Sequence, residues 1–283
     1  QYIGMGKNLF KKYDYAKKIF HTASDILEYD IKKICFYEDE KIHKTKYTQP
    51  SIFIYNLIAD YIAKELGYNP LAFAGHSLGE YSALVSSNCI SIENALKIIK
   101  IRSEEMDIKN NEKPGKMCAV LNITKKTFIN IKNNINGEIV IANYNSKLQK
   151  IISGESLAID TFISHAKKNN IKTIPLRVSG AFHSPLMKNV KIKLDKIIKS
   201  TKFNDIIRPI YQNVDSNKKF KGNEIKKGLL KQIISPVLWV KTIDNMTNNH
   251  SMKFLEIGPG NVLTRLNKNI NKNIDSLNFK NII

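Results

Sequence analysis

The chain alternates between segments of helical periodicity and short apolar runs. Apolar residues at helical spacing predict helices at 14–28, 48–66, 80–88, 91–106, 186–200 and 222–234. Short apolar runs predict strands at 71–74, 208–214 and 252–258. The most apolar helix has a capping region at Thr48 and Ser51 and a stop at Gly67. Because helices that alternate with strands usually cover a mostly parallel sheet, this rhythm predicts an α/β core.

The segment from residue 116 to residue 178 has a different rhythm. It follows a polar stretch with proline and glycine, residues 110–116, which is a candidate domain boundary. Its predicted elements are strands at 117–123, 138–145, 150–154 and 172–178 and helices at 125–135 and 156–170. This β-α-β-β-α-β order is ferredoxin-like. We therefore expect a core of residues 1–115 and 179–283 with a ferredoxin-like insert at 116–178, which would place a second wall over the core's site.

Hydropathy and cysteine usage exclude several classes of protein. No apolar run approaches the length of a membrane span, and the chain does not begin with a signal peptide. Cys35, Cys89 and Cys118 are odd in number, widely spaced and outside any C-x-x-C motif. We therefore predict reduced core cysteines, and neither a disulfide framework nor a zinc site.

The net charge of +20 raises the question of nucleic-acid binding. The lysines, however, are scattered among asparagine and isoleucine along the whole chain, as AT-rich codon usage would produce. No stretch interleaves basic and aromatic residues on one face. We expect no nucleic-acid partner, whereas a basic surface would suit an acidic partner and a phosphate-bearing ligand.

The strongest chemical signal is the sequence Gly75-His76-Ser77-Leu78-Gly79, between a predicted strand and a predicted helix. In this context G-x-S-x-G is typical of a nucleophile elbow, in which a strained turn exposes the serine hydroxyl above a sheet. The following helix N-terminus can offer backbone N–H groups to an oxyanion. The alternative is an ordinary tight turn with a serine that faces solvent.

A nucleophilic serine needs a base, and His183 is the strongest candidate. It lies at a strand-to-helix junction, where α/β sheets assemble their sites. His76 is adjacent to Ser77 and either lines the pocket wall or packs. The remaining histidines are expected at the surface: His21, His43, His165 and His250.

No acidic residue completes a hydrolase triad in the usual order. Asp107 and Asp160 lie between the serine and the histidine, but in a polar region and in a helix of the insert. A backbone carbonyl can orient the histidine instead. Arg102 is notable because lysine supplies most basic residues here. It either pairs with Glu104 or Glu105 on a helix surface or binds a carboxylate with its guanidinium.

Eight segments in order carry a family resemblance: TQPSIF, GHSLGEYSALV, IRSEEM, ANYNS, ISG, GAFHSPLM, SPVLW and EIGPGNVLT. Together they resemble the malonyl-CoA:acyl carrier protein transacylases and the related acyltransferase domains of polyketide and fatty-acid synthases. The resemblance covers nearly the whole chain. It implies an α/β-hydrolase-like core with an inserted ferredoxin-like subdomain. It also implies a cytoplasmic or organellar monomer that needs no metal or redox cofactor.

The resemblance implies a role for each matching residue. Ser77 would accept the acyl group, His183 would be its base, and the backbone N–H of Leu78 would form half of the oxyanion hole. The main-chain carbonyl of Gln232 would orient the histidine, and Arg102 would hold the malonyl carboxylate. Asn143 and His76 would line the substrate pocket. Phe182 directly precedes the base, and in the acyltransferase domains a phenylalanine at this position accompanies a preference for malonyl over methylmalonyl substrates.

One feature departs from the family. Its members begin with a strand and then G-Q-G-S-Q, whose first glutamine donates the second oxyanion hydrogen bond. Gln1 aligns with the last glutamine of that motif, so the first core strand and the donor are expected to be missing from this chain. The implied reaction moves a malonyl group from malonyl-CoA to acyl carrier protein through a malonyl-serine ester. A serine esterase or thioesterase, or the acyltransferase component of a polyketide synthase, remains the alternative.

Overall fold

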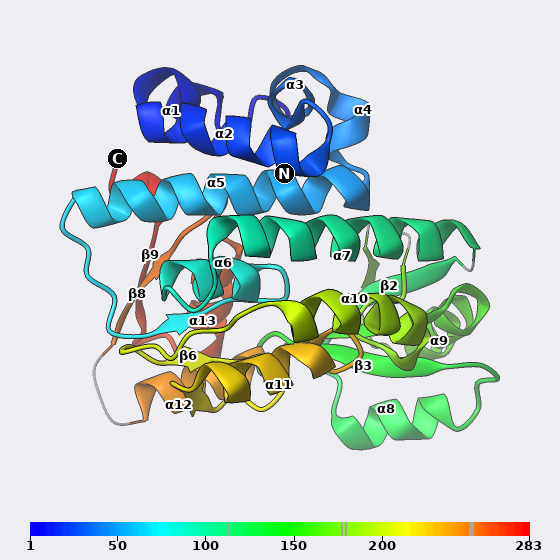
Figure 1. Cartoon of the computed structure of the whole chain (residues 1–283). Helices are drawn as coiled ribbons and strands as arrows, with labels where there is room; N and C mark the ends of the chain where they lie inside the picture. The colour runs from blue at the N-terminus through cyan, green and yellow to red at the C-terminus, as the bar shows by residue number, and fades with distance from the viewer. Residues whose placement is uncertain (113, 177, 179, 249–251) are drawn as a thin grey trace.

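The computed structural model describes residues 1–112, 114–176, 178, 180–248 and 252–283. Its first part is helical. The helices α1 (Lys7–Lys12), α2 (Asp14–Leu27), α3 (Ile31–Tyr37) and α4 (Asp39–Ile42) form a layer against one side of α5 (Thr45–Glu65). On the other side of α5 runs α7 (Ile92–Glu112) (Figure 1). Apolar residues of α2, α5 and α7 belong to one buried cluster, which makes these helices a large part of the core.

The α5 helix begins earlier than its sequence predicts. Thr48 and Ser51 lie inside it, and their hydroxyls donate to the carbonyls of Ile42 and Tyr47, so the predicted capping role is wrong. Pro50 lies within this helix and has no N–H to donate to the carbonyl four residues earlier. That carbonyl, of Lys46, lies 3.5 Å from the Tyr29 hydroxyl. Tertiary packing therefore stabilises the helix on both sides of Pro50.

Short strands form the sheets of the core. The pair β1 (Phe73–Ala74) and β6 (Ile210–Tyr211) is parallel, as expected. The next strand, β7 (Lys218–Lys219), is antiparallel to β6, which the expectation of parallel strands did not include. A second parallel pair joins β8 (Lys253–Glu256) to β9 (Asp275–Asn278). The helices between these strands are α6 (Gly79–Ser86), α10 (Lys188–Ser200), α11 (Gly222–Gln232), α12 (Trp239–Thr247) and α13 (Val262–Ile270).

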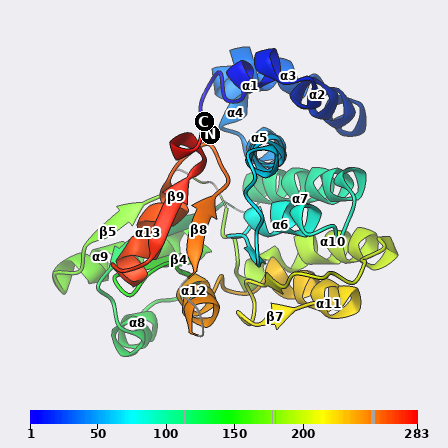
Figure 2. The same ribbon diagram turned by 90° about the vertical axis from the view of Figure 1, so that its left-hand side faces the viewer.

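A four-stranded antiparallel sheet lies to one side of this core, in the order β3-β4-β2-β5 (Figure 2). Its strands are β2 (Gly115–Leu121), β3 (Ile139–Tyr144), β4 (Gln149–Glu155) and β5 (Thr173–Pro175). Two helices, α8 (Lys125–Lys132) and α9 (Ser156–Lys168), connect them. Cys118 and Val120 of β2 pack in one cluster with residues of these helices. Met117 and Ala119 pack in a different cluster with Phe182, because successive side chains of a strand point to opposite faces.

Cys35, Cys89 and Cys118 are buried free thiols, as predicted. Among the described residues, no helix has both the length and the apolar character that crossing a membrane would require. Parts of the predicted linker and of the predicted boundary after β5 lie outside the described residues, namely Lys113, Arg177 and Ser179, and so does His250.

Candidate active site

Ser77 lies in the turn between β1 and α6 with a φ of +52°, in the left-handed region that non-glycine residues rarely adopt. A Cβ atom on Gly75 would lie 2.0 Å from the carbonyl carbon of Gly79, so only glycine fits at position 75. The corresponding position on Gly79 meets open space. The turn therefore requires glycine at position 75, whereas position 79 has room for a side chain.

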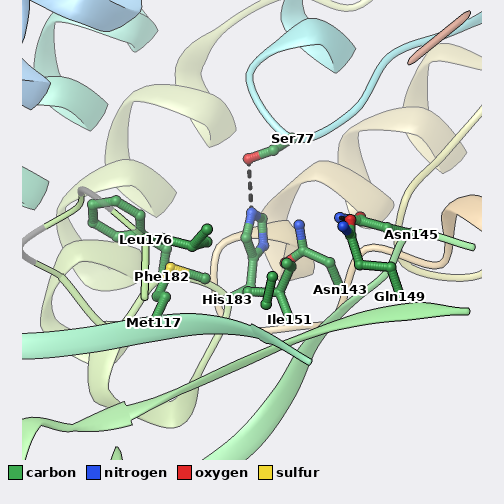
Figure 3. Close-up of a pocket in the computed structure, with 10 residues that line it drawn as sticks. Ser77, Met117, Asn143, Asn145, Gln149, Ile151, Leu176, Phe182 and His183 are labelled. Atoms are coloured by element: carbon green, nitrogen blue, oxygen red, sulfur yellow. Dashed lines mark hydrogen bonds between the residues drawn. The ribbon is translucent and has the colours of Figure 1, made fainter. Parts of the chain in front are cut away.

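Ser77 and His183 come together from positions 106 residues apart in the chain. The Oγ atom of Ser77 lies 2.7 Å from Nε2 of His183 (Figure 3). The other ring nitrogen, Nδ1, lies 3.1 Å from the carbonyl oxygens of both Gln232 and Ser235. Since carbonyls only accept, Nδ1 carries the proton and Nε2 is free to accept the serine proton.

The environment of His183 favours the neutral imidazole. Burial and the positive charge of Arg102 lower the pKa of His183 to about 3, although the two carbonyls act in the opposite direction. Among the described residues no carboxylate contacts His183, and Asp160 instead pairs with Lys116 at 2.7 Å. A histidine that is neutral near pH 7 and aimed at a hydroxyl can act as a general base.

Arg102 is 2% exposed and lies beside the serine. One guanidinium nitrogen, Nη2, donates to Ser77 Oγ at 3.1 Å, and Nη1 donates to Oε1 of Gln49. The guanidinium carbon lies 5.5 Å from the centre of the Tyr81 ring. Burial lowers the pKa of Arg102, but an arginine stays protonated in proteins.

The surface alternative for Arg102 is wrong. Glu104 pairs with Lys46 at 3.3 Å, and Glu105 pairs with Lys193 at 3.1 Å. No described carboxylate forms an ion pair with Arg102, and its Nε atom is buried without a hydrogen-bond partner. A buried cation without an anion is costly unless a ligand supplies one. The site therefore favours a substrate that carries a carboxylate.

A cavity of about 320 Å³ opens beside Ser77 and His183. Figure 3 shows Met117, Leu176 and Phe182 on one side of His183 and Asn143, Asn145 and Gln149 on the other. The apolar side comes largely from the four-stranded sheet and from the residue before the base. Phe182, the residue before the base, lines this cavity.

Asn143 lines the cavity and its Oδ1 atom is buried without a partner among the described residues. His76 is not one of the described residues that line the cavity. Its Nε2 lies 2.9 Å from Oδ1 of Asn145 and 3.4 Å from Nδ2 of Asn143, and its ring packs against Trp239. This placement links the elbow to the segment that follows β3, through Asn145.

Several polar residues of the site were not predicted: Gln49, Asn145, Gln149 and Asn213. Gln49 and Asn145 lie inside the quoted segments TQPSIF and ANYNS, so those segments carried a usable signal.

The backbone N–H of Leu78, at the start of α6, finds no acceptor among the described residues and is free for an oxyanion. No group of three or more metal-ligating side chains occurs in the described ranges. Of the other histidines, His21 and His43 are exposed and His165 is half-buried.

Comparisons with known proteins agree on one family. The family model of the acyl transferase domain matches residues 1–281. The chain is 33% identical over 282 residues to the malonyl CoA-acyl carrier protein transacylase of Bacillus subtilis (strain 168), across 98% of this chain and 89% of that protein. It is 32% identical to the solved MCAT of Streptococcus pneumoniae, with a TM-score of 0.91 and coverage of 98% and 92%. It is also 30% identical to PlMCAT, a malonyl-transacylase solved with its type II PKS acyl-carrier protein, with a TM-score of 0.92 and coverage of 98% and 92%.

Proposed function

This chain belongs to the acyl transferase domain family, and on that premise we propose that it moves a malonyl group from malonyl-CoA to the phosphopantetheine thiol of an acyl carrier protein. The observation that carries the substrate choice is the buried guanidinium of Arg102, which has no described carboxylate partner and lies beside the nucleophile. A planar guanidinium can bind a carboxylate through two parallel hydrogen bonds. Malonyl brings such a carboxylate, and acetyl does not.

In the first step, Ser77 Oγ attacks the thioester carbonyl while its proton moves to Nε2 of His183. The tetrahedral oxyanion accepts a hydrogen bond from the backbone N–H of Leu78. When the intermediate collapses, the C–S bond breaks and the coenzyme A thiolate takes the proton back from His183. A malonyl-serine ester and free coenzyme A result.

In the second step the thiol of the carrier protein gives its proton to His183 and attacks the ester. The C–O bond to Ser77 breaks, and the serine recovers its proton from the imidazolium. Arg102 would hold the malonyl group so that the ester carbonyl faces the incoming thiol. Each transfer uses only the two substrates and this chain's own residues.

The finer division of the fold is part of the same proposal. We assign residues 1–115 and 179–283 to an α/β-hydrolase-like core and residues 116–178 to a ferredoxin-like insert. The order β3-β4-β2-β5 supports this assignment. The insert supplies Met117, Asn143 and Asn145 to the cavity, so it would form the wall opposite the elbow. Besides the Leu78 N–H, the oxyanion hole would have a second donor, which in the family is the first glutamine of G-Q-G-S-Q. We further expect a monomer that acts in the cytoplasm.

The transferase and the thioesterase differ in what accepts the acyl group. With malonyl-CoA and holo acyl carrier protein, we expect malonyl on the carrier protein to form much faster than free malonate, as followed by mass spectrometry. Acyl carrier protein without its phosphopantetheine arm is the control and should accept nothing. Free malonate as the main product with both forms would indicate a thioesterase.

Phe182 should restrict the acyl α-carbon. Its ring lines the cavity next to His183, where a methyl branch on the malonyl group would need space. Because excluding one methyl group is worth about 1–3 kcal/mol, the Phe182→Ser variant should narrow the preference for malonyl-CoA over methylmalonyl-CoA by roughly 10- to 200-fold. The measurement is the ratio of kcat/KM for the two thioesters. An unchanged ratio in an active variant would contradict this role.

A further inference from the structure

A group of polar side chains lies buried behind the elbow, and the reaction above assigns no task to them. The group consists of the side chains of Glu80, Gln212, Asn213 and Gln232, each at most 1% exposed. Buried polar groups are costly unless their hydrogen bonds are made. Hydrogen bonds connect all four side chains to the backbone of the nucleophile or to another member of the group.

The Asn213 side chain bridges the two peptide groups on either side of His76. Its Oδ1 accepts the backbone N–H of Ser77 at 2.7 Å, and its Nδ2 donates to the carbonyl of Gly75 at 2.6 Å. A backbone N–H only donates and a carbonyl only accepts, so these partners fix the orientation of the amide. The side-chain amide thus makes the two hydrogen bonds to the elbow that the backbone of a neighbouring strand would make.

Strand pairing explains why Asn213 reaches this place. In the parallel pair β1–β6, Ala74 is opposite Tyr211, and both strands end there. The chain then turns at Gly75, and among the described residues the β1–β6 pairing ends at Ala74 and Tyr211. Beyond the last backbone pair, the side-chain amide of Asn213 makes the hydrogen bonds to the next peptide groups of the elbow.

Glu80 holds Asn213 in turn. One carboxylate oxygen accepts the backbone N–H of Asn213 at 2.9 Å, and the other accepts Nε2 of Gln212 at 3.0 Å. Glu80 follows directly after Gly79 in the first turn of α6. Glu80 in α6 therefore fixes the position of Asn213, and Asn213 in turn is hydrogen-bonded to the backbone of the elbow.

Gln232 contacts both members of the catalytic pair. Its main-chain carbonyl lies 3.1 Å from Nδ1 of His183, while its side-chain Nε2 donates to the carbonyl of Ser77 at 3.0 Å. The Ser77 carbonyl also accepts the N–H of Glu80 at 3.1 Å. The backbone N–H and the carbonyl of Ser77 are thus both occupied by groups from the second half of the chain or from α6.

We propose that the side-chain amides of Asn213 and Gln232 are positioning residues that hold Ser77 in its left-handed conformation, with its hydroxyl aimed at His183. A serine at a φ of +52° persists only where its surroundings over-determine it. These amides also leave Leu78 as the elbow N–H available to the oxyanion, since the Ser77 N–H is already used. The inference rests on the proposed function for only one of its three readouts, the steady-state malonyl transfer.

The test compares Asn213→Ala with Asn267→Ala. Asn267 is a matched control because it is also buried and its amide accepts from Trp239 at 3.1 Å, away from the elbow. The readouts are steady-state malonyl transfer, the melting temperature, and the rate at which a fluorophosphonate labels Ser77. Labelling forms a P–O bond and expels fluoride, so it requires the Ser77–His183 pair but no malonyl group.

Because a misplacement of about 1 Å can cost about 10²-fold in rate, we expect Asn213→Ala to lower both kcat and the labelling rate by roughly that factor, with KM little changed. Asn267→Ala should lower the melting temperature but label at the wild-type rate. Equal labelling by folded Asn213→Ala and wild type would overturn the proposal. A wild type that labels but transfers no malonyl would refute the proposed function and leave the labelling comparison valid.

Two further variants keep the test decisive if Asn213→Ala does not fold. Asn213→Asp keeps an acceptor for the Ser77 N–H but loses the donor to Gly75, so its labelling rate should fall between those of wild type and the alanine variant. Gln232→Ala removes the side-chain bond to Ser77 and keeps the carbonyl on His183. We expect it to label more slowly with an unchanged pH profile. A shifted pH profile, or a wild-type labelling rate in both variants, would contradict the assignment.

Discussion

The Ser77→Ala variant should form no covalent adduct with malonyl-CoA and should lose malonyl transfer almost completely. The Oγ atom of Ser77 is the atom that His183 Nε2 approaches, at 2.7 Å. Removing the nucleophile of a serine enzyme costs up to about 10⁶-fold in kcat. Intact-protein mass spectrometry after incubation with malonyl-CoA should find one malonyl group on the wild type and none on the variant.

The matched control for this experiment is Ser82→Ala. Ser82 lies in α6, the helix that follows the elbow, and its hydroxyl lies 3.1 Å from the Asn56 amide, away from His183. This variant should form the adduct as the wild type does. An adduct that persists in Ser77→Ala would show that Ser77 is not the acylated residue.

The elements that the sequence predicted well are those with a strong period or a strong local signal. The helix at 14–28 is observed as Asp14–Leu27, and the one at 156–170 as Ser156–Lys168. The strand at 117–123 is observed as β2, Gly115–Leu121. The similarity to the acyl transferase family confirms the resemblance that the ordered motifs indicated.

Other elements could not be predicted because tertiary contacts form them. The α4 helix has only the four residues Asp39–Ile42, too few for a period, and β7 is two lysines paired with β6. The α5 helix extends upstream of Thr48 because packing outweighs the local capping signal. Helix α13 is amphipathic but carries no clear stop signal before Asn271.

The candidate site shows the same division. Ser77 was visible from five consecutive residues, because the elbow is a local structure. Asn213 was not, because its task depends on which residue of β6 lies opposite the end of β1, and only the register gives that. Arg102 was ambiguous for a similar reason. The sequence left open whether its guanidinium lies on the helix surface or binds a carboxylate, and only the packing of Gln49 and Tyr81 shows that it is buried.

Replacing Arg102 with alanine should reduce malonyl transfer far more than acetyl transfer. The guanidinium is buried, and truncating one partner of a buried charge pair costs about 2–5 kcal/mol. That energy corresponds to a loss of roughly 30- to 5,000-fold in kcat/KM for malonyl-CoA. Acetyl-CoA has no carboxylate, so its kcat/KM corrects for the lost contact between Arg102 and Ser77 Oγ. Equal losses on both thioesters would indicate a structural arginine.

The pH dependence of Arg102→Ala and Arg102→Lys separates the effect of the Arg102 charge from the effect of the guanidinium shape. The acid limb of kcat/KM for acetyl-CoA reports the pKa of His183, which burial and the Arg102 charge lower to about 3. Removing the cation should raise that pKa, so the acid limb of Arg102→Ala should move to higher pH, whereas Arg102→Lys keeps a charge and should keep the limb low. Because folded His183 binds its proton more weakly than the unfolded chain does, the free energy of unfolding decreases as the pH falls below 6.5. Rates are therefore compared only where circular dichroism shows the fold intact. An acid limb that stays in place in Arg102→Ala would mean that burial alone sets the basicity of His183 and that the guanidinium serves only to bind the carboxylate.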